Sequence, residues 1–173
     1  MLRITVNRAP VLTLWAAVVA ERLGFDRDEA LTMGRVVAGL NAYAKGKSLG
    51  LFKPAPEEVK RERKRLAPGA VMYVELLGRA VPIVRTPEGL RALSKNAPVS
   101  PASVQRYLES KFGDALPAVE KEMKALARSM PADELARRAY ELYEAFRPEV
   151  PPGVRGWGAA GTLDLARIRA AAR

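Results

Sequence analysis

Three residues in the first third of the chain, Gly46-Lys47-Ser48, match the end of a phosphate-binding loop. Such a loop has a glycine, four residues of any type and then Gly-Lys-Ser or Gly-Lys-Thr, and it lies between a strand and a helix. Asn41 occupies the position of the first glycine, and the segment follows a predicted helix. The pattern therefore does not predict an NTPase, and we interpret Gly46 as the C-terminal cap of that helix.

A second glycine pattern, Gly156-Trp-Gly-Ala-Ala-Gly161, matches the G-x-G-x-x-G fingerprint of dinucleotide-binding folds. That fingerprint requires a strand directly before it. Here the segment PEVPPGVR precedes the glycines, so we interpret them as a Gly-rich loop that leads to a short helix. We expect Trp157 to dock this tail onto the core. Arg155 and Trp157 are also auxiliary candidates for contact with a partner.

Residues 16–35 fit the frame of a helix-turn-helix motif, with Gly24 in the turn between two apolar segments. The helix that would read the major groove begins with the segment DRDE, whose three carboxylates would repel phosphates. Asp26 and Glu29 have the spacing of a capping box instead. We therefore favour a capped helical hairpin, and a DNA-reading motif is the alternative.

Residues 45–65 carry eight cationic and three acidic side chains. The eight cations, here called the basic zone, are Lys45, Lys47, Lys53, Lys60, Arg61, Arg63, Lys64 and Arg65. Such a zone can neutralise several phosphates without reading sequence, so we predict that it binds nucleic acid. The alternative is a solvated helix stabilised by internal pairs such as Glu57 with Arg61. The sequence leaves both interpretations open.

The side chains most often used in catalysis are missing. The chain has no histidine and no cysteine, which removes the commonest general base, the thiolate nucleophile and most transition-metal ligands. The carboxylates have helical ion-pair spacing, as in Asp133, Arg137 and Glu141, and none has the spacing of a Ca²⁺ loop. We therefore expect no metal or cofactor and name no catalytic residue.

The composition is that of a globular protein. The 173 residues are 49% apolar and carry a formal net charge of +10. Asn and Gln are nearly absent, as in heat-adapted proteins, although a GC-rich genome gives a similar bias. The apolar run 9–20 keeps helical spacing with the residues after it. We therefore predict a retained first helix instead of a signal peptide, no membrane span and a cytoplasmic location.

The predicted fold is mainly α, a single compact multi-helix domain with a small β-hairpin around 71–84. A helical hairpin is expected over 9–46, starting at Pro10, and a basic helix over 56–66. Period-2 alternation predicts the β-hairpin, with Gly78-Arg79 as its turn. Pro82 cannot donate a ladder hydrogen bond, so we expect the second strand at a sheet edge.

Helices are predicted for most of the remaining chain. The helical part, 87–147, divides into helices of about 87–95, 101–112, 115–129 and 131–147. Their starts are marked by Thr86-Pro87, Ser100-Pro101 and Asp114, which are typical capping residues. The Gly-rich loop and a short C-terminal helix, capped by Thr162, complete the predicted elements over 153–173.

Two segments resemble a family of small uncharacterised bacterial proteins. They are RAPVLTLWAAVVAERLGFDRDEALTMGRVVAGLNAYAKGKSLGLF and RGWGAAGTLDLARIR, which together cover about a third of the chain. The resemblance implies that the domain stands alone and recurs. It implies no activity and no functional residues.

These observations give three functional hypotheses. The first is a non-enzymatic protein that binds nucleic acid through the basic zone. The second is a protein-interaction module whose basic helix contacts an acidic partner or a second copy of the chain. The third, an enzyme without His or Cys chemistry, has the least support. Nucleic-acid binding should weaken steeply with salt, whereas an apolar protein interface should barely respond.

Overall fold

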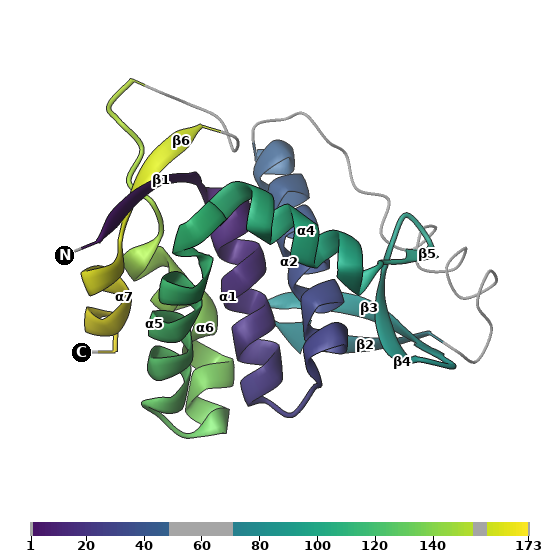
Figure 1. Ribbon diagram of the computed structural model, residues 1–173. Helices are drawn as coiled ribbons and strands as arrows, with labels where there is room; N and C mark the ends of the chain where they lie inside the picture. The colour runs from purple at the N-terminus through teal and green to yellow at the C-terminus, as the bar shows by residue number, and fades with distance from the viewer. Residues whose placement is uncertain (1, 49–70, 154–158, 173) are drawn as a thin grey trace.

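Helix α1 (Arg8–Arg22) lies at the centre of the protein (Figure 1). The computed structural model describes residues 2–48, 71–153 and 159–172, with residues 42–48 described by their backbone alone. Every side chain of α1 from Pro10 to Ala20 is buried, although the first residues of the helix are partly exposed. Because α1 is apolar on all sides, it needs neighbours on all sides.

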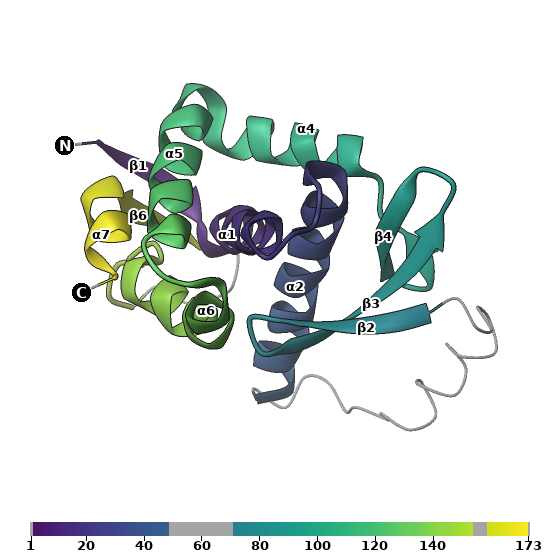
Figure 2. The ribbon, with the colours of Figure 1, turned by 90° about the horizontal axis from the view of Figure 1, so that it is seen from below.

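Four helices supply most of those neighbours. Viewed along α1, helix α2 (Arg27–Ser48) lies on one side, and α5 (Leu116–Arg128) and α6 (Ala132–Phe146) lie on the other (Figure 2). Helix α4 (Pro101–Phe112) contacts both α1 and α2. Trp15 fixes the contact with α6, because its indole Nε1 donates to the carbonyl of Ala139 at 2.8 Å.

The turn between α1 and α2 is closed by a capping box. Asp26 Oδ1 accepts from the backbone N–H of Glu29 at 2.8 Å, and Glu29 Oε1 accepts from the N–H of Asp26 at 3.1 Å. Two donors at the start of α2 are thereby satisfied. Gly24, in the turn, has a φ of +115°, which a side chain would strain. The predicted helical hairpin and its capping box are confirmed.

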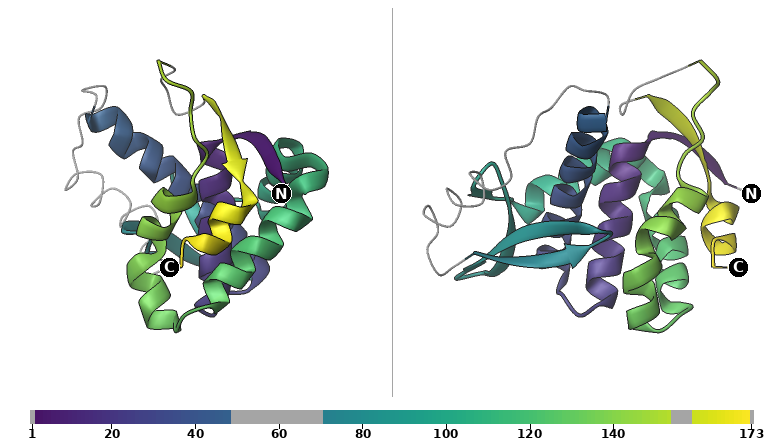
Figure 3. Two further views of the ribbon diagram at one scale, coloured as in Figure 1. Left: turned by 90° about the vertical axis from the view of Figure 1, so that its left-hand side faces the viewer. Right: turned by 180° about the vertical axis from the view of Figure 1, so that it is seen from behind.

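A four-stranded antiparallel sheet packs against α2 (Figure 3, right). Its strands are β2 (Val71–Leu76), β3 (Arg79–Thr86), β4 (Gly89–Ser94) and β5 (Ala97–Pro98), in that spatial order. Two side chains of α2 accept hydrogen bonds from backbone N–H groups of β4. Glu29 Oε2 accepts from the N–H of Leu90 at 2.9 Å, and Thr32 Oγ1 accepts from the N–H of Ala92 at 3.0 Å. Helix α2 therefore satisfies backbone donors that β4 would otherwise leave unpaired.

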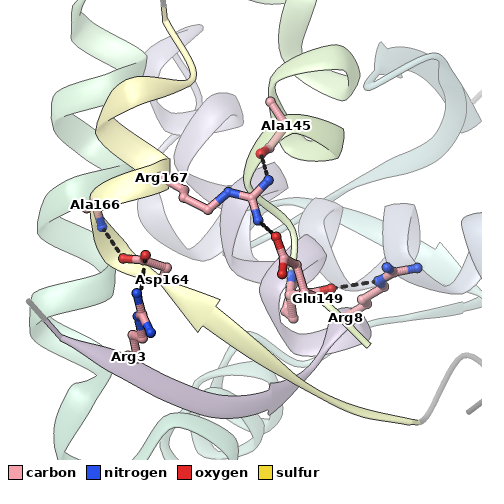
Figure 4. A network of polar contacts seen from close by, with 8 residues as sticks. Arg3, Arg8, Ala145, Glu149, Asp164, Ala166 and Arg167 are labelled. Carbon is pink, nitrogen blue, oxygen red and sulfur yellow. Dashed lines mark hydrogen bonds and ion pairs between the residues drawn. The ribbon is translucent and has the colours of Figure 1, made fainter. Parts of the chain in front are cut away.

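A second sheet joins the two ends of the described chain (Figure 3, left). Strand β1 (Arg3–Asn7) pairs antiparallel with β6 (Ala160–Asp164), so that Arg3 lies opposite Asp164. Helix α7 (Leu165–Ala170) follows directly. Polar contacts secure this tail: Arg167 bonds to Glu149 and to the carbonyl of Ala145, and Arg3 pairs with Asp164 (Figure 4).

The predicted mainly α fold is therefore wrong, and the protein is α+β with two sheets. The segment 87–95, predicted as a helix, contains β4. The Thr86 hydroxyl does form local hydrogen bonds, but they close a hairpin turn and do not cap a helix. It accepts from Glu88 N at 3.3 Å and donates to Gly89 O at 2.7 Å. Gly89 then has a φ of +126°, which is incompatible with an α-helix.

The predicted β-hairpin over 71–84 exists, but two of its details are wrong. The turn residues are Leu77 and Gly78, both with positive φ, and Leu76 lies opposite Arg79. Strand β3 lies between β2 and β4 and is not an edge. Its pairing with β4 begins at Ile83, so the missing donor of Pro82 falls outside that ladder.

The predicted caps have mixed outcomes. Ser100 caps α4 as expected, accepting from the N–H of Ser103 at 3.3 Å. Asp114 lies in a 3₁₀ turn and does not cap α5. Thr162 lies within β6, and Asp164 caps α7 by accepting from Ala166 N at 3.0 Å. Helix α2 continues past Gly46 to Ser48, so Gly46 is not its C-terminal cap.

Within residues 2–48, 71–153 and 159–172, no helix is both long enough and apolar enough to cross a lipid bilayer.

Candidate nucleic-acid interface

The structure describes only part of the basic zone. Lys45 and Lys47 belong to the last turns of α2. The other six cations lie outside the described residues, as do the predicted helix over 56–66 and the auxiliary candidates Arg155 and Trp157. The described elements that flank the zone in the sequence are α2 before it and the four-stranded sheet after it.

The basic zone and the elements around it, α4 included, carry almost all of the net charge of the protein. Residues 30–113 contain fifteen Lys and Arg against six Asp and Glu, a net of +9 out of the total of +10. This part, here called the basic half, comprises most of α2, the four-stranded sheet and α4. The remaining residues, here called the balanced half, carry fourteen cations and thirteen acidic groups. The charge is thus concentrated on one part of the fold.

The two halves also differ in how their cations are compensated. Every ion pair among the described residues joins two residues of the balanced half, as in Arg27 with Glu120 at 3.0 Å and Arg169 with Glu122 at 2.7 Å. In the described parts of the basic half, seven cations form no ion pair. They are Arg35, Arg79, Arg85, Arg91, Lys95, Arg106 and Lys111. The positive charge of this half is therefore uncompensated where the structure describes it.

Two of these cations gather around one aromatic ring. The guanidinium carbon of Arg35, on α2, lies 5.1 Å from the centre of the Tyr107 ring, on α4. The ammonium of Lys111 lies 6.0 Å from the same centre. Burial raises the pKa of Tyr107, and the nearby Arg35 opposes that rise. We call these three residues the Tyr107 cluster.

Arg35 of the Tyr107 cluster lies on the same helix as the start of the basic zone. Between Ala30 and Ala38, Arg35 is the only exposed residue of α2, and Gly39, four positions later on the same helical face, is exposed too. Lys45 follows ten residues after Arg35, which is about 15 Å along the helix axis. Helix α2 thus contains residues of both the Tyr107 cluster and the basic zone.

The hairpin turn of the sheet lies beside this end of α2. Arg79 Nη2 donates to Asn41 Oδ1 at 3.1 Å, which ties the start of β3 to α2. The first strand of the sheet, β2, exposes two large side chains, Met72 at 45% and Tyr73 at 40%. They alternate along an edge strand and so point to opposite faces of the sheet. An exposed aromatic side chain such as Tyr73 offers a surface on which a base can stack.

Sequence reasoning missed Arg35, Tyr107 and Lys111. Arg35 and Tyr107 come from two helices and meet only because α4 packs across α2. In the sequence, Tyr107 and Lys111 follow an ordinary helical spacing, and Arg35 is one cation among apolar residues. No local pattern would have found the cluster.

Residues 16–35 form the predicted helical hairpin. Eight of the nine residues from Ala30 to Ala38 are buried, because α2 packs against α1, α4 and the sheet. The N-terminal residues of α2, which a recognition helix would place in the major groove, include the exposed Asp28 and the half-buried Glu29, and these carboxylates would repel phosphates. The DNA-reading alternative stays a prediction.

The two glycine patterns have structural explanations in the described residues. Gly46-Lys47-Ser48 is helical, whereas a phosphate-binding loop would not be. Gly161 lies in β6, where an added Cβ would be 2.8 Å from the carbonyl oxygen of Glu149 and 2.9 Å from Pro148 Cβ. A glycine is needed there because two chain segments approach closely. Gly156 and Gly158 lie outside the described residues.

Comparisons with protein-family models, with curated proteins and with solved structures gave no significant match. The resemblance to a bacterial family stays a prediction.

Proposed function

We propose that the protein binds nucleic acid, without catalysing a reaction, through the basic zone and the Tyr107 cluster, which we together call the basic face. The observation that supports this proposal most strongly is the absence of ion pairs from the described residues of the basic half, which contrasts with the ion pairs of the balanced half. Cations that a fold leaves uncompensated on one side favour a polyanionic partner.

The expected mode of binding is contact with phosphates. Lys and Arg neutralise phosphates and release condensed counterions, which supplies affinity without sequence preference. The Tyr107 cluster fits this role, because Arg35 and Lys111 approach the same ring and carry like charges that a phosphate would compensate. The ring itself already has a cation on it, so we assign it to positioning these two cations and not to stacking with a base.

A matched pair of double variants tests the proposal. Changing Arg35 and Lys111 to Glu should weaken binding to labelled DNA and RNA by at least about tenfold at 50 mM salt, and should reduce the salt slope by about 2, one for each phosphate contact. The control changes Lys121 and Arg137 to Glu. These two residues are exposed cations of the balanced half and have no described ion pair. The control lowers the net charge by the same amount as the Arg35 and Lys111 double variant.

Comparing the two double variants distinguishes a localised binding face from attraction by the overall net charge. The proposal predicts that the control keeps the wild-type affinity to within about threefold, because its charges lie away from the face. Equal losses in both double variants would contradict a localised face. In a further variant, Lys60, Arg61, Arg63, Lys64 and Arg65 become Glu, and binding should disappear.

A further inference from the structure

A second positively charged feature lies apart from the Tyr107 cluster. A hollow of about 500 Å³ opens between the start of α2, strand β4 and the start of α4. Its walls include Arg27 and Asp28 from α2, Arg91 from β4, and Ser100 and Ala102 from the start of α4. Three elements that are distant in sequence thus bring polar groups to one concave site.

The decisive side chain in the hollow is Arg91. Only 9% of this residue is exposed, and its one bond within the described residues is from Nη1 to the carbonyl of the preceding residue, Leu90, at 2.8 Å. An arginine has five N–H donors, so most of this guanidinium has no described partner. Among the described residues, Glu120 Oε1 is the one enclosed side-chain N or O atom without a hydrogen bond, so the unbonded donors of Arg91 are open to solvent and an anion in the hollow could accept from them.

Arg91 forms no ion pair with the acidic groups near it. Glu29 Oε2 and Arg91 Nη1 both lie beside Gly89, 3.3 and 3.5 Å from an added Cβ, but the two are not an ion pair. Glu29 uses one carboxylate oxygen on Asp26 N and the other on Leu90 N. Asp28 lines the hollow, but it is exposed and likewise forms no described ion pair. Arg27, the other cation, is engaged by Glu120 at 3.0 Å, so Arg91 is the cation of the site that has no described ion pair.

The start of α4 adds favourable backbone dipoles. Ser100 satisfies the N–H of Ser103, and Pro101 has no N–H to offer. The N–H of Ala102, the second residue of the helix, has no partner within the helix. It belongs to a residue that lines the hollow. A helix N-terminus with a free N–H beside a buried arginine is suited to an anion with several acceptor oxygens.

We propose that this hollow binds a phosphoryl group, through Arg91 and the N-terminus of α4. The group can belong to free phosphate, to a nucleotide or to the end of an oligonucleotide, because the hollow recognises the same oxygens in each.

The phosphoryl site is distinct from the proposed nucleic-acid face. Arg27 reaches Gln105, at 3.0 Å, whereas Arg35 contacts Tyr107. Residues 105 and 107 of a helix point about 200° apart, so the two sites lie on different sides of α4. Binding in the hollow therefore does not depend on the proposed function.

The proposal is tested by calorimetric titration of the whole protein. The ligands are inorganic phosphate, AMP, and short oligonucleotides that carry a 5′-phosphate or a 5′-hydroxyl. We expect at least one of the phosphate-bearing ligands to bind, and the 5′-hydroxyl oligonucleotide not to bind in the hollow. Whichever of the three binds most tightly identifies the source of the group. If neither phosphate nor AMP nor the 5′-phosphate binds in a way that depends on Arg91, the proposal is wrong.

Substitutions in the hollow distinguish a loss of the anion site from a loss of folding. Arg91→Gln should lower the affinity at least about tenfold, and Arg85→Gln, an exposed arginine of β3, should leave it unchanged. Ala102→Asp places a carboxylate where the helix dipole favours it, so the fold is kept while the anion is repelled. Asp28→Asn should strengthen binding because it removes a carboxylate from the hollow. Unaltered binding by Ala102→Asp would overturn the proposal.

Discussion

Single side chains in this protein connect distant segments mainly by bonding to backbone groups. Trp15 bonds to the carbonyl of Ala139, Arg8 Nε to the carbonyl of Pro148 at 3.0 Å, and Arg22 to the carbonyl of Met130 at 3.2 Å (Figure 4 shows the contact of Arg8). Each bond joins α1 to α6 or to a residue beside it. These side chains therefore position the helices of the balanced half without using the charges of other side chains.

Tyr143 offers a test of this packing through pH. Its side chain is fully buried, and burial, the largest cause, raises its pKa above the ordinary value of 10.0. Above about pH 10 the tyrosine ionises in the unfolded chain while the folded chain keeps it neutral. The stability that Tyr143 contributes is thus complete below pH 10 and is lost as pH rises further, by about 1.4 kcal/mol per pH unit.

The variant Tyr143→Phe should therefore lose less stability than the wild type between pH 9 and pH 11. At pH 9 it should be less stable by about 1 kcal/mol, because it lacks the bond from the hydroxyl to the carbonyl of Arg8. Urea unfolding at both pH values measures the difference, with Tyr73→Phe, an exposed tyrosine, as the control. A difference between wild type and Tyr143→Phe that is the same at both pH values would contradict the prediction.

At the scale of elements, α1 and α2 approach each other closely at Gly34. A Cβ added to Gly34 would lie 2.3 Å from the carbonyl oxygen of Thr13 and 3.2 Å from Ala17 Cβ. The glycine lets the two helix backbones pack together, and α2 in turn packs against the four-stranded sheet. This contact therefore helps to position the sheet relative to α1.

Gly34→Ala should destabilise the protein by about 1–3 kcal/mol or more, because the clash is with backbone and cannot be relieved by a rotamer change. Gly39→Ala, on the same helix, is the matched control, since an added Cβ there meets nothing within 4 Å. It should leave stability unchanged or raise it by up to about 1 kcal/mol through helix propensity. Equal effects of the two substitutions in thermal or urea unfolding would refute a close helix contact at Gly34.

The elements that were predicted correctly from the sequence are marked by patterns within their own segments. Helix α1 is a continuous apolar run, α2, α4, α5 and α6 have apolar spacing of 3.6 residues, and α4 has the Ser100-Pro101 start. Strands β1 and β6 were missed because each finds its partner more than 150 positions away, and such pairing has no local pattern. Strand β4 was missed because Thr86-Pro87 begins a hairpin turn here, whereas the same residues often begin a helix.

At the scale of the whole molecule, the distribution of charge is the feature that indicates a function. The net charge of +10 and the basic zone were visible in the sequence. The contrast between a compensated and an uncompensated half was not, because Arg169 with Glu122 and Arg3 with Asp164 are pairs formed only by the fold. The burial of Arg91 was equally invisible, since it depends on the packing of β4 against α2.

The most direct test of the proposed function is the salt dependence of binding to labelled DNA and RNA, measured by fluorescence anisotropy between 50 and 200 mM salt. If the basic face neutralises six or more phosphates, the logarithm of the binding constant should fall with the logarithm of salt concentration. The slope for duplex DNA should be about −5 or steeper, and the affinity should fall about a thousandfold over this range. Absence of binding at 50 mM salt, or binding that salt does not weaken, would contradict the proposal that this face recognises phosphates.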